Sequence, residues 1–150
     1  MKIPRRYIPK TLSKRDSGKQ RSNLNKSRRL YKRGVYVSRP TLKSFRSRKS
    51  SHIKNAKSKY GVKTVSVSSL SKKSGCSQSA LRKILSKGRG AYYSSGSRPN
   101  QTAESWARAR LASSLTGGPA SKVDYSILKN GCKPGSSALR AARSTRKNRK

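Results

Sequence analysis

The stretch SSLSKKSGCSQSALRKILSKG, residues 68–88, decides the fold because it holds two short helical patterns joined by a glycine. The first pattern ends at Gly75, and Ser77 can cap a second helix that ends at Gly88. The apolar residues of that second helix are Ala80, Leu81, Ile84 and Leu85. Two short helices joined through a glycine turn are the layout of a helix-turn-helix. We therefore predict a mainly α protein, a small helical domain that contains a helix-turn-helix-like hairpin.

The spacing around the glycine supports this prediction. With Gly75 as the turn, the positions where the motif has apolar residues are Leu70, Cys76, Leu81 and Ile84. Ser71 supplies the small residue that should face the second helix. Ser74 departs from the pattern, because an apolar side chain is usual there. The match is therefore good but incomplete.

The second helix has a functional and a structural interpretation. In the functional one, the side chains of Gln78, Arg82 and Lys83 face a DNA major groove, with Ser77 and Ser79 beside them. Of these, only Gln78 and Arg82 can contact bases bidentately. In the structural one, the hairpin only packs the core. The sequence leaves both open.

Residues 88–102, GRGAYYSSGSRPNQT, combine three glycines, a tyrosine pair and small polar residues. Glycine allows backbone conformations closed to other residues, so we expect a short β-hairpin or a tight loop. With a helix beginning after Thr102, this loop could hold a phosphate through backbone amides. The candidate side chains are Arg89, Ser95, Ser97 and Arg98. The alternative is a structural loop that seats Tyr92, Tyr93 and Trp106 in the core.

Capping residues and apolar spacing predict further helices on both sides of this region. We expect them over residues 14–33, 51–60, 103–115, 125–130 and 138–142, with Asp124 as the cap of the fourth. Residues 35–45 should form a short extended piece. The first helix has a thin apolar stripe around Leu24 and Tyr31, so it should order on a partner rather than on a core of its own.

The charge of the chain is extreme. Forty Lys and Arg stand against three acids, Asp16, Glu104 and Asp124, which gives a net charge of +37. Such an imbalance is relieved by counterions or by a polyanionic partner. Basic residues are densest in a basic, extended or helical arm, residues 1–60, and in a basic tail, residues 137–150, which flank a compact helical domain at 61–136.

Ten basic residues of the arm and tail are the candidate polyanion-binding residues. They are Arg28, Arg29, Lys32, Arg33, Arg46, Arg48, Lys49, Arg146, Lys147 and Arg149. Arg46, Arg48 and Lys49 lie in a segment where serine and basic residues alternate. That segment is either a solvated basic loop or a contact to nucleic acid.

Several function classes find no support in the sequence. Cys76 and Cys132 lack CxxC spacing and have one histidine, His52, to help them, so we expect two isolated buried thiols and no metal. Three scattered acids do not supply the clustered carboxylates of a metal-dependent nuclease. We expect no enzyme activity, no cofactor and no small-molecule substrate.

The sequence shows no targeting or membrane segment. It begins Met1-Lys2-Ile3-Pro4 without the apolar run of a signal peptide, and no stretch approaches the ~20 apolar residues of a membrane span. We expect a protein made in the cytoplasm or nucleus and not secreted.

Beyond these patterns, several segments resemble a known family. They are the run from Gly88 to Thr102, then Ser105-Trp106, Ala109-Arg110-Leu111, Thr116-Gly117-Gly118 and Lys122-Val123-Asp124. They are similar to an uncharacterised family of basic proteins encoded by large DNA viruses, including the chlorella viruses and their relatives, and by tailed phages. The resemblance covers roughly residues 60–130. It supplies no binding or catalytic residues, and it implies a component of a double-stranded DNA virus particle.

In that setting two hypotheses stay open. The first is a virion structural protein, a minor capsid or capsid-associated component whose basic arm binds acidic capsid proteins, an anionic membrane surface or DNA. The alternative is a sequence-tolerant DNA-binding or DNA-condensing protein that is packaged with double-stranded DNA.

Overall fold

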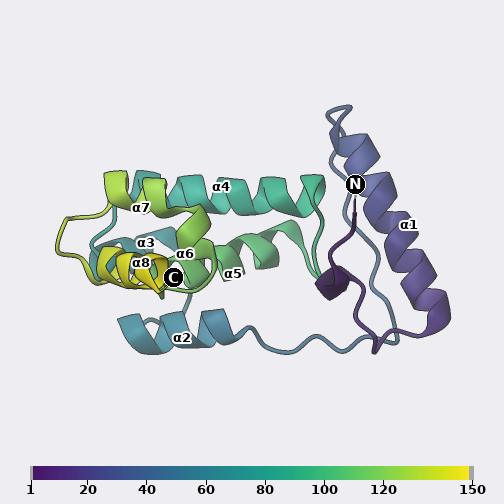
Figure 1. The fold of residues 1–150 in the computed structure, drawn as a ribbon, viewed down its shortest axis with the longest axis horizontal. Helices are drawn as coiled ribbons and strands as arrows, with labels where there is room; N and C mark the ends of the chain where they lie inside the picture. The colour runs from purple at the N-terminus through teal and green to yellow at the C-terminus, as the bar shows by residue number, and fades with distance from the viewer. Residues whose placement is uncertain (1, 149–150) are drawn as a thin grey trace. The chain divides into compact units, whose positions relative to one another are not determined.

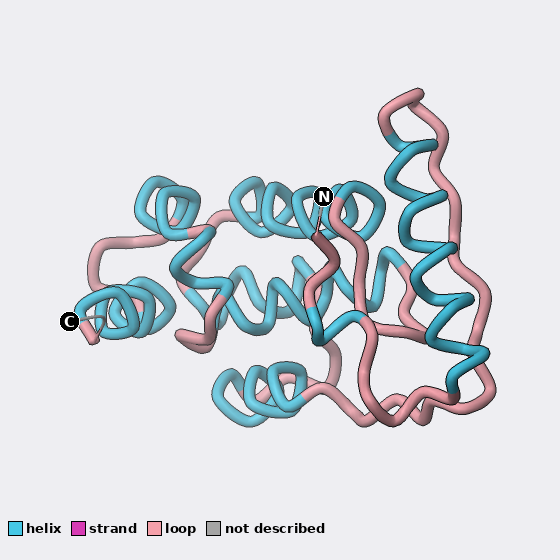
Figure 2. The backbone as a smooth tube through the Cα atoms, turned by 45° about the vertical axis from the view of Figure 1, so that its right-hand side comes forward, coloured by secondary structure: helices cyan, strands magenta, loops and turns pink. Residues whose placement is uncertain are grey.

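The structure, a computed structural model, describes residues 2–148, and within them it contains eight α-helices, one short 3₁₀-helix and no β-strand (Figures 1 and 2). The predicted mainly α fold is confirmed. Contacts divide the chain into two compact units. Unit 1 consists of Met1–Arg48 and Arg89–Trp106, and unit 2 of Lys49–Gly88 and Ala107–Lys150. The domain boundaries expected after residues 60 and 136 stay a prediction.

Unit 1 begins with the 3₁₀-helix η1 (Arg5–Tyr7) and the long helix α1 (Lys14–Tyr31). The hydroxyl of Ser13 caps α1 by accepting a hydrogen bond from the N–H of Asp16 at 3.2 Å. Gly34 follows the helix with φ +77°, a left-handed conformation that glycine adopts without strain. The chain reverses there, and the next segment runs back beside α1 without helix or strand structure (Figure 2).

Burial of α1 differs from the expectation that this helix needs a partner to order. Leu24 is fully buried and Gln20 nearly so. The side-chain amide of Gln20 donates to the carbonyls of Tyr7 at 3.0 Å and Ser97 at 3.4 Å. A buried amide must find such partners, and here they hold η1 and the 95–102 loop against α1. A count of apolar positions in the sequence does not reveal that polar residues such as Gln20 are part of this buried face.

Unit 2 contains α2 (Ser51–Tyr60) and α3 (Val67–Ser74), and the helices that follow complete the fold. They are α4 (Gln78–Ser94), α5 (Ala103–Leu115), α6 (Ala120–Val123), α7 (Tyr125–Gly131) and α8 (Ser137–Lys147). The core of unit 2 is built from fully or almost fully buried aliphatic residues, namely Leu70, Leu81, Ile84, Leu111, Leu115, Leu128 and Leu139. The helix α8 continues to Lys147, so most of the predicted basic tail is helical.

The β-hairpin expected at residues 88–102 is not formed. Instead α4 continues through Gly88 and Gly90 to Ser94, and only residues 95–102 form a loop. The reason lies in packing, because a Cβ at Gly88 would stand 2.6 Å from the Cα of Ala107. Gly88 therefore lets α5 approach the backbone of α4 closely, and it does not end the helix.

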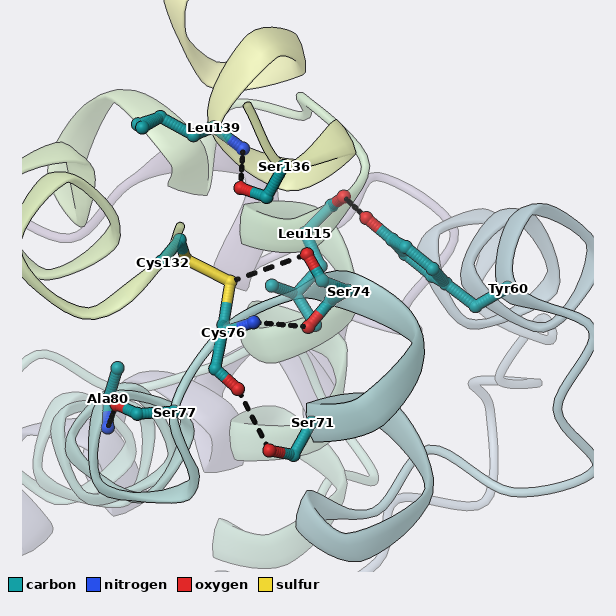
Figure 3. The surroundings of a disulfide bond; sticks show 10 residues. All are labelled: Tyr60, Ser71, Ser74, Cys76, Ser77, Ala80, Leu115, Cys132, Ser136 and Leu139. Carbon is teal, nitrogen blue, oxygen red and sulfur yellow. Dashed lines mark hydrogen bonds between the residues drawn. A yellow bond between two sulfur atoms is a disulfide. The ribbon is translucent and has the colours of Figure 1, made fainter. Parts of the chain in front are cut away.

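Cys76 and Cys132 form a disulfide across 56 positions of sequence (Figure 3). The prediction of two isolated thiols is wrong, although both residues are buried as expected. The backbones around the cysteines pair as an antiparallel bridge, through Ser77 N–H to Gly131 O at 2.8 Å and Lys133 N–H to Gly75 O at 2.9 Å. The bridge brings the two cysteines opposite each other. The sequence does not reveal this pairing, because the cysteines are far apart along the chain.

Candidate nucleic-acid interface

The helices α3 and α4 are joined through a turn at Gly75, which is left-handed at φ +74°. The Ser71 hydroxyl donates to the carbonyl oxygen of Cys76 at 2.8 Å, which holds the end of α3 against the turn (Figure 3). The Ser77 hydroxyl accepts from the N–H of Ala80 at 3.2 Å and caps the first turn of α4. These bonds fix the direction in which α4 leaves α3.

One side of α3, the turn and α4 is buried in the core of unit 2. Its buried residues are Leu70, Ser74, Cys76, Leu81 and Ile84. Ser74, the departure from the motif, is accommodated because its hydroxyl accepts the N–H of Cys76 at 3.3 Å. A buried hydroxyl with a partner costs little, so serine can replace an apolar side chain at this position.

The outer side of α4 is open and contains no acidic residue. Its exposed residues are Ser77, Gln78, Ser79, Arg82, Lys83, Ser86 and Lys87. Residues three and four apart share one face of a helix, so these side chains form one continuous polar and basic strip. Within the strip, Arg82 Nη2 donates to Gln78 Oε1 at 3.0 Å. The two side chains best suited to base contact therefore bind each other in the free protein.

A shallow cleft borders this strip on the side of α7. It is lined by Ser77, Ser79, Ala80 and Lys83 on one side and by Ser126, Ile127, Asn130 and Gly131 on the other. Gly131 makes the close approach possible, since a Cβ there would lie 2.3 Å from that of Ala80. The lining includes hydroxyl, amide and ammonium groups, which are groups that contact nucleic-acid backbones.

Two of the three acidic side chains are engaged within unit 1. The Asp16 carboxylate accepts the hydroxyl of Ser44 at 2.6 Å and its N–H at 3.1 Å, and these bonds lower the pKa of Asp16. Glu104 forms an ion pair with Arg89, which raises the pKa of Arg89. These carboxylates therefore serve internal contacts.

The third acid, Asp124, lies fully buried in unit 2. Both of its oxygens accept from Arg110, at 2.7 and 3.0 Å, and the Ser114 hydroxyl donates to one of them at 2.8 Å. The prediction that Asp124 caps α7 is wrong, because its side chain makes no capping hydrogen bond and points to α5 instead. With all three acids engaged, little negative charge faces the basic surface.

Most of the predicted polyanion-binding residues are exposed. They are Arg29, Lys32, Arg33, Arg46, Arg48, Lys49, Arg146 and Lys147, while Arg149 lies outside the described residues. Arg28 is different, because it is largely buried and its guanidinium donates twice to the carbonyl of Ser95, at 2.6 and 3.0 Å. Arg28 is therefore a structural residue of unit 1.

The predicted phosphate loop is occupied by internal contacts. Ser97 is buried, and its hydroxyl accepts from Arg39 at 2.9 Å and donates to the carbonyl of Arg98 at 2.8 Å. Arg89 is paired with Glu104, whereas Ser95 and Arg98 are exposed. The contacts match the alternative interpretation of a structural loop, and phosphate binding here stays a prediction.

The described part of the chain, residues 2–148, contains no group of three His, Cys, Asp or Glu residues placed to hold a metal ion. None of its helices combines the length and apolar character needed to span a bilayer.

Residues 4–137 match one sequence family over most of the chain. The chain belongs to DUF5824, a family of unknown function. No curated protein and no solved structure matches it. Membership of an uncharacterised family agrees with the resemblance described above, while the viral or phage origin stays a prediction.

Sequence reasoning missed two features of this DUF5824 chain. One is the disulfide, and the other is an exposed tyrosine, Tyr36, in the loop after α1. The sequence signal for Tyr36 is its position two residues after Gly34, because a residue that follows the end of a helix often lies at the surface. The partners of its ring, Tyr31 and Tyr93, could not be paired from the sequence.

Proposed function

We propose that this chain is a non-enzymatic DNA-binding protein that places the outer strip of α4 in the major groove of a duplex. The observation that carries the proposal is the acid-free, exposed strip from Gln78 to Lys87 on a helix held by a glycine-turn hairpin. The major groove is wide enough to admit an α-helix, and helix-turn-helix proteins place their second helix there.

The charge of the whole chain supports the same proposal. A net charge of +37 favours a polyanion, and the phosphates of DNA supply a regular array of negative charge. Exposed basic residues also lie elsewhere in unit 2, including Lys129 on α7, Lys133 after it and Arg146 on α8. These residues would add phosphate contacts that carry no sequence information.

Binding is expected to be sequence-tolerant. Serine and lysine dominate the strip, and only Gln78 and Arg82 have the geometry for bidentate base contacts. Those two must also exchange their mutual hydrogen bond for a base contact, which lowers the gain. We expect weak preference on top of strong electrostatic affinity.

The proposal is tested by measuring duplex affinity across sequences and salt concentrations. About ten phosphate contacts would give a log–log salt slope near −9, and a flat salt response would reject DNA neutralisation as the role. Gln78→Ala and Arg82→Ala should alter the ranking of duplex sequences. An unchanged ranking would leave the hairpin as a packing element.

A second candidate function is a virion structural protein, a minor capsid or capsid-associated component. The observation that favours it is the Cys76–Cys132 disulfide, because disulfides persist outside the reducing cytosol, including on virus particles. In this role the basic surfaces bind acidic capsid proteins or anionic lipid headgroups. The particle is then the site where the protein works.

Fractionation of particles separates the two functions. A capsid component stays with empty shells after the DNA is removed, whereas a DNA-binding protein leaves with the genome. Recovery in the nucleoprotein fraction alone would reject the capsid role.

A further inference from the structure

A row of four tyrosine rings crosses unit 1 from its interior to its surface. Adjacent rings meet edge to face, with centroids 5.1 Å apart for Tyr92 and Tyr93, 5.2 Å for Tyr93 and Tyr36, and 5.7 Å for Tyr36 and Tyr31. Tyr92 is fully buried, whereas 66% of the Tyr36 surface is exposed. The row therefore anchors an exposed ring to the core.

The inner end of the row is rigidly held. The Tyr92 hydroxyl donates to the carbonyl of Gln101 and accepts the N–H of Arg39, both at 3.2 Å. The Arg39 guanidinium lies 3.8 Å from the centre of the Tyr92 ring and donates to the carbonyl of the same residue at 2.9 Å. Burial lowers the pKa of Arg39. Arg39 thus works inside unit 1 and fixes Tyr92.

The outer end is placed by the C-terminus of α1. Gly34 N–H donates to the carbonyl of Tyr31 at 2.9 Å, and Val35 N–H donates to that of Leu30 at 3.0 Å. These bonds close the end of the helix and hold Tyr36 directly beyond it. Tyr36 and its neighbour Val35, 46% exposed, are the large hydrophobic residues that unit 1 leaves exposed among the described residues.

The chain just before Tyr36 is basic. Arg29, Lys32 and Arg33 are exposed on the last turn of α1 and just beyond it. The single acid of α1, Asp16, lies in the first turn of that helix and is bonded to Ser44. An exposed aromatic ring among cations is the chemistry by which proteins bind single-stranded nucleic acid, since bases stack on the ring and phosphates pair with the charges.

We propose that Tyr36 is a base-stacking residue, and that with Lys32 and Arg33 it forms a binding site for single-stranded DNA. This site belongs to unit 1, and it does not depend on the duplex binding proposed for α4. The apolar area offered by Val35 and Tyr36 is small, and the charge beside it is high. Both properties suit a nucleotide better than an apolar peptide or the interior of a bilayer.

The test compares Tyr36→Ala with Tyr36→Phe, which keeps the ring and serves as the matched control. The probes are an oligothymidylate of about twenty nucleotides and an abasic strand of equal length. Tyr36→Ala should weaken oligothymidylate binding about tenfold without changing the salt slope, because no phosphate contact is lost. Tyr36→Phe should bind like the wild type, and the abasic strand should not distinguish the three proteins.

The cationic part of the site has its own readout. Lys32→Ala and Arg33→Ala should each reduce the salt slope for the single strand by about 0.7. Duplex affinity should stay unchanged in Tyr36→Ala, so a failure of the duplex proposal and a failure of this one give different results. Circular dichroism confirms that the variants fold.

Three outcomes would overturn the proposal. Equal affinities of Tyr36→Ala and wild type for oligothymidylate would show that no base stacks on the ring. An equal loss for the abasic strand would show that the ring acts without bases. If Tyr36→Ala binds oligothymidylate like the wild type but binds phosphatidylserine vesicles, measured in parallel, more weakly, the exposed ring belongs to a membrane-binding surface instead.

Discussion

Arg110 and Asp124 form a two-point ion pair between α5 and the start of α7, with N–O distances of 2.7 and 3.0 Å. Asp124 is fully buried, while the Arg110 side chain is 19% exposed. Asp124 therefore stabilises unit 2, and its charge is paired with Arg110 rather than with an exposed basic side chain.

Removal of this buried charge should be costly. Asp124→Asn is expected to lower the free energy of unfolding by about 3 kcal/mol, because the Arg110 guanidinium would lose its partner in a largely buried position. Glu104→Gln is the matched control, since the Arg89–Glu104 pair is exposed and should contribute under about 1 kcal/mol. Urea unfolding of both variants checks this, and equal losses would contradict the assigned role of Asp124.

The disulfide should contribute strongly to the stability of unit 2. In the chain-entropy model, closing a loop of 56 positions raises the free energy of the unfolded chain by about 4 kcal/mol. Reduction, or the variant Cys132→Ser, should therefore lower the unfolding midpoint in denaturant. Detection of two free thiols in the unreduced, folded protein would contradict the bond.

Two helical glycines should respond to alanine in opposite directions. Gly18 lies in α1 with open space where a Cβ would stand, so Gly18→Ala should stabilise the protein by about 0.5–1 kcal/mol. Gly88→Ala should destabilise it by about 2 kcal/mol, because the new Cβ meets the backbone of Ala107. Thermal unfolding compares the two, and a stabilising Gly88→Ala would refute the close packing of α4 on α5.

Asp16 should make unit 1 sensitive to acid. Hydrogen bonds from Ser44 lower its pKa in the folded state, so its contribution is present above the unfolded value of about 3.9 and is lost as the pH falls through the lower folded pKa. Asp16→Asn should unfold at a lower temperature than wild type near pH 7, and the difference should vanish in acid. A difference independent of pH would show that the carboxylate charge is not responsible.

Much of the helical framework follows from local signals. Serine side chains cap α1, α2 and α8, namely Ser13, Ser50 and Ser136, and Gly61 ends α2 in the left-handed conformation. The left-handed turn at Gly75 and the burial of Leu70, Cys76, Leu81 and Ile84 also agree with the expected spacing. Such features depend on residues close in sequence, which is why they can be predicted.

What could not be predicted depends on distant partners. Local sequence predicts that Gly88 ends a helix and that Asp124 caps one. The close approach of Ala107 to Gly88 and the ion pair of Asp124 with Arg110 explain why neither happens. The candidate strip of α4 was predictable from local spacing, whereas the site at Tyr36 needs the approach of Tyr93. Tertiary contacts override local preference in each case.

The central claim, that the outer strip of α4 binds duplex DNA, is tested most directly by salt-dependent duplex affinity of two double variants. Lys83→Ala with Lys87→Ala removes two charges from the strip, and Lys54→Ala with Lys57→Ala removes two exposed charges from α2. We predict that the first pair reduces the log–log slope by about 1.8 and that the second leaves it unchanged. Equal slopes for the two double variants would contradict the claim.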